Sequence, residues 1–171
     1  SNLIKKSKER KKQKLFVVEG PKMCFEAPVE WIKAIYMSES FYNDNRYVKE
    51  KKTLWQMAEI VADGVFKSVS DTQTPQGVIA IVKMPEYKLE DLFDGEKTHL
   101  LLIESIQDPG NLGTMIRTGE GAGVSGIIMN RTTVDLFNPK TIRSTMGSIY
   151  RVPFVIADDL QDTINILQEK N

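Results

Sequence analysis

The chain has 171 residues, enough for one large domain or two small ones. Its 23 basic and 23 acidic side chains balance, and no apolar run approaches the roughly 20 residues that a membrane-spanning helix needs. A single cysteine, Cys24, and a single histidine, His99, exclude an internal disulfide and a zinc site built from these residue types. We therefore expect a soluble cytoplasmic protein with no membrane partner and no catalytic metal. Magnesium held by carboxylates is the alternative that these counts leave open.

Positive charge is concentrated at the N-terminus. Residues 1–14 carry seven basic side chains against one acidic side chain, which leaves a net charge of +6 on this arm and −6 on the rest of the chain. Such an arm is a candidate for binding the phosphates of a nucleic acid, and the alternative is a solvated or frayed helix end. The candidate RNA-binding residues of the arm are Arg10, Lys11, Lys12 and Lys14.

The first half of the chain alternates strand-like and helix-like segments. The predicted elements are a strand at 15–18, a short helix at 22–26, a strand at 32–37, a helical stretch at 42–57, a strand followed by a short helix at 58–68, and a strand at 77–82. The last of these strands is entirely apolar, which predicts a central place in a sheet. This half is expected to form a small α/β domain over residues 1–86.

The second half follows a polar stretch at 87–97, which we interpret as a linker with one short helical turn. Beyond it, the predicted elements are strands at 100–106, 127–129 and 152–156, and helices at 111–121, 139–146 and 159–169. Three successive β/α units predict a parallel sheet with both faces covered. We therefore expect a second α/β domain over residues 98–171.

A glycine pattern at 121–126, GAGVSG, matches the G-x-G-x-x-G pattern of dinucleotide-binding domains. In those domains the pattern follows a strand and opens a helix, so that the helix N-terminus meets the pyrophosphate. Here it follows a predicted helix and precedes a predicted strand. Its glycines are better explained by a helix stop and a tight turn, and a nucleotide-dependent oxidoreductase ranks last among the alternatives.

The loop after the strand at 100–106 is the first candidate site. It lies at the carboxyl end of a parallel strand, where open α/β sheets place their ligands. The helix that follows is predicted to begin near Asn111, a favourable N-cap residue, and it carries Arg117 one to two turns later. The alternative is that Asn111 only caps the helix and Arg117 only forms a surface ion pair.

A second candidate lies at 138–147, where the sequence predicts a cap, a proline in the first helical position, two helical turns and a glycine stop. Lys140 and Arg143 are three residues apart and therefore share a helix face, with Ser144 beside them. These residues predict an anion site. The alternative is a short surface helix with solvated charges.

Together these segments resemble a known family. Residues 108–118 (DPGNLGTMIRT) and 138–148 (NPKTIRSTMGS) are similar to the first conserved segment and the middle region of the SpoU (TrmH-like) branch of the SPOUT RNA methyltransferases. Residues 10–20 (RKKQKLFVVEG) and 74–83 (TPQGVIAIVK) resemble the substrate-binding domain that often precedes this catalytic domain. The resemblance extends over essentially the whole chain.

The resemblance implies transfer of a methyl group from S-adenosylmethionine to a ribose 2′-hydroxyl of rRNA or tRNA, by a homodimer whose catalytic domain contains a trefoil knot. Arg117 matches an arginine implicated in catalysis, and Asn111 matches an asparagine that orders its loop. Lys140, Arg143 and Ser144 match a region expected near the RNA.

The family segments that shape the cofactor pocket and complete the knot have no counterpart in this chain. We therefore expect the cofactor-binding residues beyond Asn171, and we expect this chain to be an inactive N-terminal portion of the enzyme. A non-catalytic RNA-binding protein on the same scaffold is the alternative function.

Overall fold

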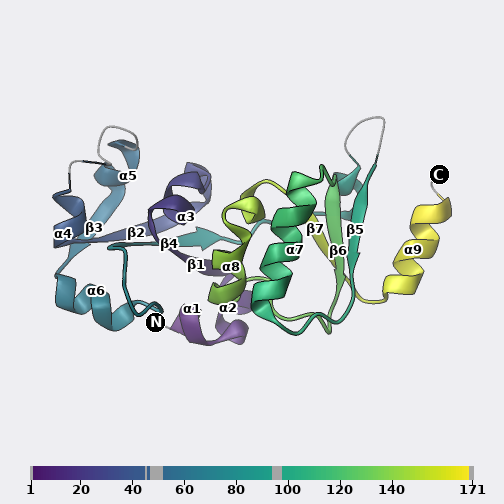
Figure 1. The fold of residues 1–171 in the computed structure, drawn as a ribbon, viewed down its shortest axis with the longest axis horizontal. Helices are drawn as coiled ribbons and strands as arrows, with labels where there is room; N and C mark the ends of the chain where they lie inside the picture. Colours follow the sequence, from purple (N-terminus) through teal and green to yellow (C-terminus); the bar gives the residue numbers. More distant parts are fainter. Residues whose placement is uncertain (1, 45, 47–51, 94–97, 170–171) are drawn as a thin grey trace. The chain divides into compact units, whose positions relative to one another are not determined.

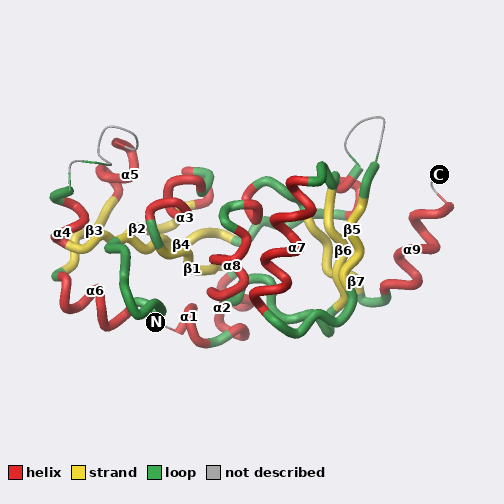
Figure 2. Tube along the Cα trace, viewed as in Figure 1, coloured by secondary structure: helices red, strands yellow, loops and turns green. Residues whose placement is uncertain are grey.

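The structure is a computed structural model that describes residues 2–44, 46, 52–93 and 98–169. The chain forms two compact units, Ser1–Met84 and Pro85–Asn171 (Figure 1). Both units combine helices with strands, so the predicted α/β class is confirmed (Figure 2). Among the described residues, no helix is both long enough and apolar enough to cross a lipid bilayer.

A mixed four-stranded sheet forms the centre of the first unit. Its strands are β1 (Leu15–Glu19), β2 (Ile32–Ser38), β3 (Ala58–Val61) and β4 (Val78–Lys83), in the order β1-β4-β2-β3. β4 runs antiparallel to β1 and β2, whereas β2 and β3 are parallel. β4 is therefore an interior strand, as its apolar sequence predicts. This topology makes β1, β2 and β3 all end at the edge where β4 begins.

Helices cover both faces of this sheet (Figure 1). They are α1 (Asn2–Lys5), α2 (Ser7–Gln13), α3 (Pro21–Glu26), α4 (Glu39–Tyr42), α5 (Lys52–Met57) and α6 (Asp63–Val69). Leu3 and Ile4 of α1 and Phe66 of α6 pack against Val17 and Ile79 on one face. Because successive residues of a strand point to opposite faces, the neighbours of Val17 and Ile79 are directed to the other face of the sheet.

The single cysteine belongs to the core of the first unit. Cys24 lies on α3 and is fully buried, with its Sγ 3.7 Å from the carbonyl oxygen of Val18 and 3.8 Å from that of Val78. Burial raises the pKa of the Cys24 thiol far above its ordinary value. The neutral thiol therefore packs as a small apolar group.

The second unit contains a three-stranded parallel sheet, as predicted. Its strands are β5 (Leu100–Ile103), β6 (Gly126–Asn130) and β7 (Phe154–Ala157), in the order β5-β6-β7. The helices are α7 (Pro109–Gly121), α8 (Pro139–Thr145) and α9 (Leu160–Glu169). β5 ends at Ile103 rather than at residue 106, because Ser105 turns away from the strand with a φ of 54° and its amide donates to the Asn130 side chain instead.

Both faces of the parallel sheet are covered. On one face, α7 packs so closely that a Cβ on Gly119 would lie 3.1 Å from Leu101. On the other face, Leu92 of the short 3-10 helix η2 (Leu89–Leu92) is fully buried against Ile128 and Ala157, and leucines of α9 pack on the same cluster. Part of the polar stretch that the sequence suggests as a linker thus contributes an anchor to the second unit.

The anchoring role of Leu92 is testable. Leu92→Ala leaves a cavity in the Leu92–Ile128–Ala157 cluster and is expected to lower the free energy of unfolding by about 3 kcal/mol. Leu102→Ala, which removes the same atoms from a side chain that is 39% exposed on β5, is expected to cost clearly less. Urea unfolding followed by circular dichroism compares the two variants, and equal losses would contradict the assignment.

Candidate functional site

The loops that follow β5 and β6 meet at the carboxyl edge of the parallel sheet and are bonded to each other. The side-chain oxygen of Asn130 accepts hydrogen bonds from the Ser105 amide at 2.9 Å and from the Thr133 hydroxyl at 2.8 Å. The side-chain amide of Gln107 donates to the Thr132 carbonyl oxygen at 2.7 Å. These bonds fix the loop that leads into α7, at the edge where parallel sheets place ligands.

Asp108, rather than the predicted Asn111, caps α7. The carboxylate of Asp108 accepts a hydrogen bond from the Asn111 amide at 2.8 Å, and Pro109 occupies the first helical turn. This bond from the Asn111 amide and the nearby Lys140 ammonium lower the pKa of Asp108. The Asn111 side chain is consequently exposed at the start of α7 instead of serving as the cap.

Gly113 lets α7 touch the backbone of α8. A Cβ at this position would lie 2.5 Å from the Cβ of Ser144 and 2.6 Å from the carbonyl oxygen of Thr141, distances that real side chains essentially never adopt. Lys140, at the start of α8, lies with its Nζ 3.5 Å from the Asp108 carboxylate. The two segments that carry the predicted site residues are therefore side by side.

Arg117 lies on the same face of α7 as Gly113, one turn further along the helix. Its side chain is exposed and forms no hydrogen bond or ion pair with another residue in the described part of the chain. A guanidinium in this state has five N–H donors available for an anion. The arrangement can therefore hold a phosphate or a developing oxyanion beside the α7–α8 contact.

On α8, the three predicted residues differ in their surroundings. Lys140 is exposed, and Arg143 and Ser144 are half-buried. The Ser144 hydroxyl donates to the carbonyl oxygen of Lys140 at 2.9 Å, within the same helix. Lys140 is consequently the member of this group that is most accessible to a ligand.

A carboxylate that the sequence did not indicate holds the turn after α8 against α7. Glu120, three residues beyond Arg117, accepts hydrogen bonds from the buried Ser148 hydroxyl and from the Arg151 guanidinium, whose Nη2 lies 3.1 Å away. The turn contains two residues with left-handed backbone, Met146 and Gly147. The only feature of the sequence that points to Glu120 is its place three residues after Arg117, because residues three apart share a helix face.

The N-terminal arm, in the first unit, exposes only part of its predicted set. Arg10 is 3% exposed, and its Nη1 donates to the carbonyl oxygens of Leu3 at 2.8 Å and Ile4 at 3.0 Å. This guanidinium therefore ties α1 to α2, which removes it from the surface. The other members, Lys11, Lys12 and Lys14, are exposed. Within the described ranges, no group of three or more His, Cys, Asp or Glu side chains is arranged to hold a metal ion.

Comparisons with known proteins find similarity to both halves of the chain. Residues 98–171 match the SpoU rRNA Methylase family, and residues 1–80 match the MRM3-like substrate binding domain. These two matches confirm the resemblance to SpoU RNA methylases seen in the sequence.

Two curated relatives illustrate the similarity. The chain is 36% identical over 149 residues to the 23S rRNA (guanosine(2553)-2′-O)-methyltransferase RlmP of Bacillus subtilis, a match that covers 86% of this chain and 56% of that protein. It is 29% identical over 162 residues to the human mitochondrial rRNA methyltransferase 3, covering 90% of this chain and 37% of that protein. The chain thus spans about half the length of the first relative and less of the second.

Solved structures agree with this fold. The SpoU methyltransferase AviRb from Streptomyces viridochromogenes, in complex with AdoMet, has a TM-score of 0.83 at 22% identity, over 99% of this chain and 65% of that one. The AdoMet-bound rRNA methyltransferase from Sinorhizobium meliloti has a TM-score of 0.80 at 29% identity, over 98% of this chain and 62% of that one.

The link between Glu120 and Arg151 predicts a pH-dependent stability. Hydrogen bonds from Arg151 and Ser148 lower the pKa of Glu120 below its ordinary value of 4.5, so the stabilisation is complete above that value and is lost as the pH falls through the lowered pKa. We expect Glu120→Gln to lower the melting temperature at pH 7 and to have much less effect at pH 3. Glu104→Gln, at an exposed carboxylate of the same unit, should change neither value. A difference for Glu120→Gln that is independent of pH would contradict the role of its charge.

Proposed function

We propose that this protein, in a form as long as its relatives, transfers a methyl group from S-adenosylmethionine to a ribose 2′-hydroxyl of ribosomal RNA. The observation that carries this proposal is the contact at Gly113, which brings the two family segments, 108–118 and 138–148, together beside an exposed Arg117. The names of the curated relatives support the reaction and the substrate.

S-adenosylmethionine supplies a methyl group on a sulfonium centre, and a neutral ribose hydroxyl is a poor nucleophile toward it. We assign to Arg117 the role of a charged clamp that positions a neighbouring phosphate and stabilises the ribose oxygen as negative charge develops. Loss of a proton from arginine is disfavoured, because its pKa is above about 12 and a nearby phosphate favours the charged form. The general base is left unassigned, and Asn111 is assigned to ordering the loop before α7.

The described side chains fit the RNA better than the cofactor. Lys140 and Arg117 are exposed cations, whereas Ser105, Thr132 and Asn130 at the sheet edge are bonded to one another. The relatives are longer than this chain, and we therefore attribute the cofactor pocket to segments that they have in addition to the part matched here. The homodimer and the cytoplasmic location expected from the sequence belong to the same proposal, and the bacterial relative supports the latter.

Arg117 provides the test of the reaction. In a form of the protein as long as its relatives, Arg117→Ala should lower the turnover of RNA methylation by about a hundredfold or more while changing the cofactor affinity little, because a group that acts on the developing oxyanion is felt in the transition state. Arg117→Lys keeps the charge and should recover part of the loss.

Tritiated-methyl transfer to rRNA and calorimetry with S-adenosylmethionine measure the two quantities. A fully active Arg117→Ala variant would remove this residue from the mechanism. Absence of methylation by the wild-type long form, with RNA binding retained, would favour a non-catalytic RNA-binding protein. The 171-residue chain alone is expected neither to bind the cofactor tightly nor to methylate RNA, and robust activity from it would contradict this part of the proposal.

The exposed lysines of the arm are proposed to contact RNA phosphates. Replacing Lys11, Lys12 and Lys14 together with Ala should weaken RNA binding and reduce the slope of log K against log salt by about 2, since each phosphate contact contributes about 0.7–0.9. As a control with the same loss of charge, Lys22, Lys33 and Lys52 are replaced together. Fluorescence anisotropy at several salt concentrations measures both slopes, and equal slopes in the two triple variants would assign the arm to solubility alone.

A further inference from the structure

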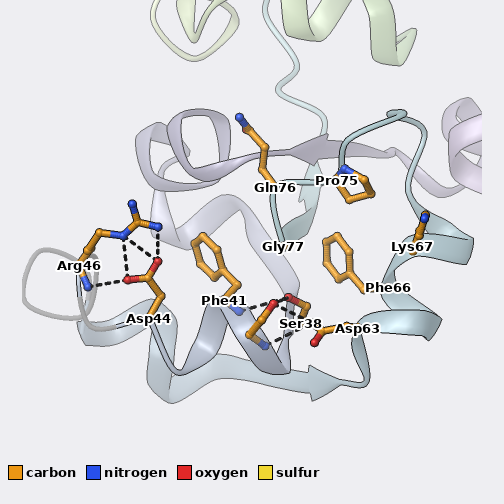
Figure 3. A pocket seen from close by; sticks show the side chains of 11 residues that line it. Ser38, Phe41, Asp44, Arg46, Asp63, Phe66, Lys67, Pro75, Gln76 and Gly77 are labelled. Atoms are coloured by element: carbon orange, nitrogen blue, oxygen red, sulfur yellow. Dashed lines mark hydrogen bonds and ion pairs between the residues drawn. The ribbon is translucent and has the colours of Figure 1, made fainter.

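The first unit contains a cavity of about 460 Å³ at the sheet edge where β2 and β3 end and β4 begins (Figure 3). This volume is within the range of about 300–1,000 Å³ that is typical of small-ligand pockets. The polar side chains that line it include Ser38, Ser40, Asp63, Lys67 and Gln76. The cavity lies outside the α7–α8 site and is not used by the proposed reaction.

The sequence forms the cavity through strand order and one glycine. Because β2 and β3 are parallel, Ser38 at the end of β2 and Asp63 just beyond β3 arrive at the same edge. Gly77 enters β4 with a φ of +82°, and a Cβ there would lie 2.6 Å from the Cβ of Phe41 and 3.0 Å from the Ser38 hydroxyl. Phe41 and Phe66 are both almost fully buried and provide an apolar floor.

The carboxylate of Asp63 lies on the exposed side of the cavity. Its Oδ1 accepts hydrogen bonds from the Ser40 hydroxyl at 2.8 Å and from the Ser40 amide at 3.2 Å. These bonds, together with the Ser38 hydroxyl, lower the pKa of Asp63, so the group is ionised at neutral pH. A carboxylate has about four acceptor positions, so Asp63 retains capacity for a ligand that donates hydrogen bonds.

The charges around the cavity select the kind of ligand. An ionised carboxylate repels a phosphate, so the position beside Asp63 suits a neutral group that carries N–H donors. Lys67, four residues after Asp63 on α6, is exposed and lines the same cavity. Asp44 and Arg46, which also line it, form an ion pair with each other. The ligand expected here has a neutral group with N–H donors beside Asp63 and a negatively charged group near Lys67. A nucleotide has both, in its base and its phosphate.

We propose that this cavity binds one unpaired guanosine nucleotide of the substrate RNA, with the Watson–Crick edge of the base donating to Asp63 and a phosphate near Lys67. Guanine presents its N1–H and N2–H groups side by side, which a carboxylate can accept together, whereas the other bases place an acceptor beside each donor. Single-stranded RNA is commonly read by such contacts to splayed-out bases. The inference rests on the proposed RNA-binding function and adds a second contact, distant in sequence from Arg117.

Hairpin RNAs with a single guanosine in an otherwise uridine loop provide the test, with inosine, which lacks the N2 amine, as the matched probe. We expect the 171-residue chain to bind the guanosine loop about tenfold more tightly than the inosine loop, as for a hydrogen bond to a charged group. Asp63→Asn should remove this preference without changing the salt dependence. Glu59→Gln, which removes a carboxylate from the exposed part of β3, should preserve the preference.

A second measurement needs no variant. Titration of the ¹⁵N-labelled chain with guanosine 5′-monophosphate should shift the amide resonances of Ser40, Asp63 and Gly77, and inosine 5′-monophosphate should shift them less. Salt-dependent RNA binding without a guanosine preference, and with these amides unmoved, would overturn the pocket and leave the RNA-binding function intact. Absence of binding to every RNA would overturn both.

Discussion

The arrangement of the second unit depends on the contact between α7 and α8, to which α7 contributes a glycine without a side chain. At Gly113, the backbone of α7 comes within reach of Ser144 and of the Thr141 carbonyl oxygen on α8, and any side chain would force the helices apart. The exposed ion pair between Asp108 and Lys140 adds little to this, since such pairs contribute about 0–1 kcal/mol. Close helix packing therefore sets the distance between Arg117 and α8.

This dependence explains why the two family segments are informative together and weak apart. Taken alone, each segment has the sequence of an ordinary capped helix, and its charged residues could simply be exposed to solvent. The two helices belong to successive β/α units, and the parallel strands β5, β6 and β7 bring them to one region of the molecule. The chemistry proposed for Arg117 follows from that juxtaposition more than from the type of any single residue.

The alternation of strands and helices, and the parallel sheet, could be predicted because continuous apolar runs are typical of buried strands. Local caps were harder to predict, since Asp108 and Asn111 are both favourable N-cap residues. The proline at position 109 favours Asp108, because proline is preferred in the first helical position.

Long-range polar contacts could not be predicted by any spacing rule. Glu120 and Arg151 are 31 residues apart in sequence, and their pairing depends on how the turn after α8 folds back on α7. The burial of Arg10 was missed for a related reason. A count of charges treats every basic residue of the arm as solvated, whereas this guanidinium completes the hydrogen bonding of α1.

The reactivity of the buried Cys24 thiol can be used to measure how often the first unit opens. Cys24 is fully enclosed and its thiolate form is suppressed, and the thiolate is the reactive species toward alkylating reagents. Alkylation therefore requires α3 to separate from the sheet, and its rate tracks the population of molecules in which the first unit has opened. Because no second cysteine competes for the label, each modified chain records one such event.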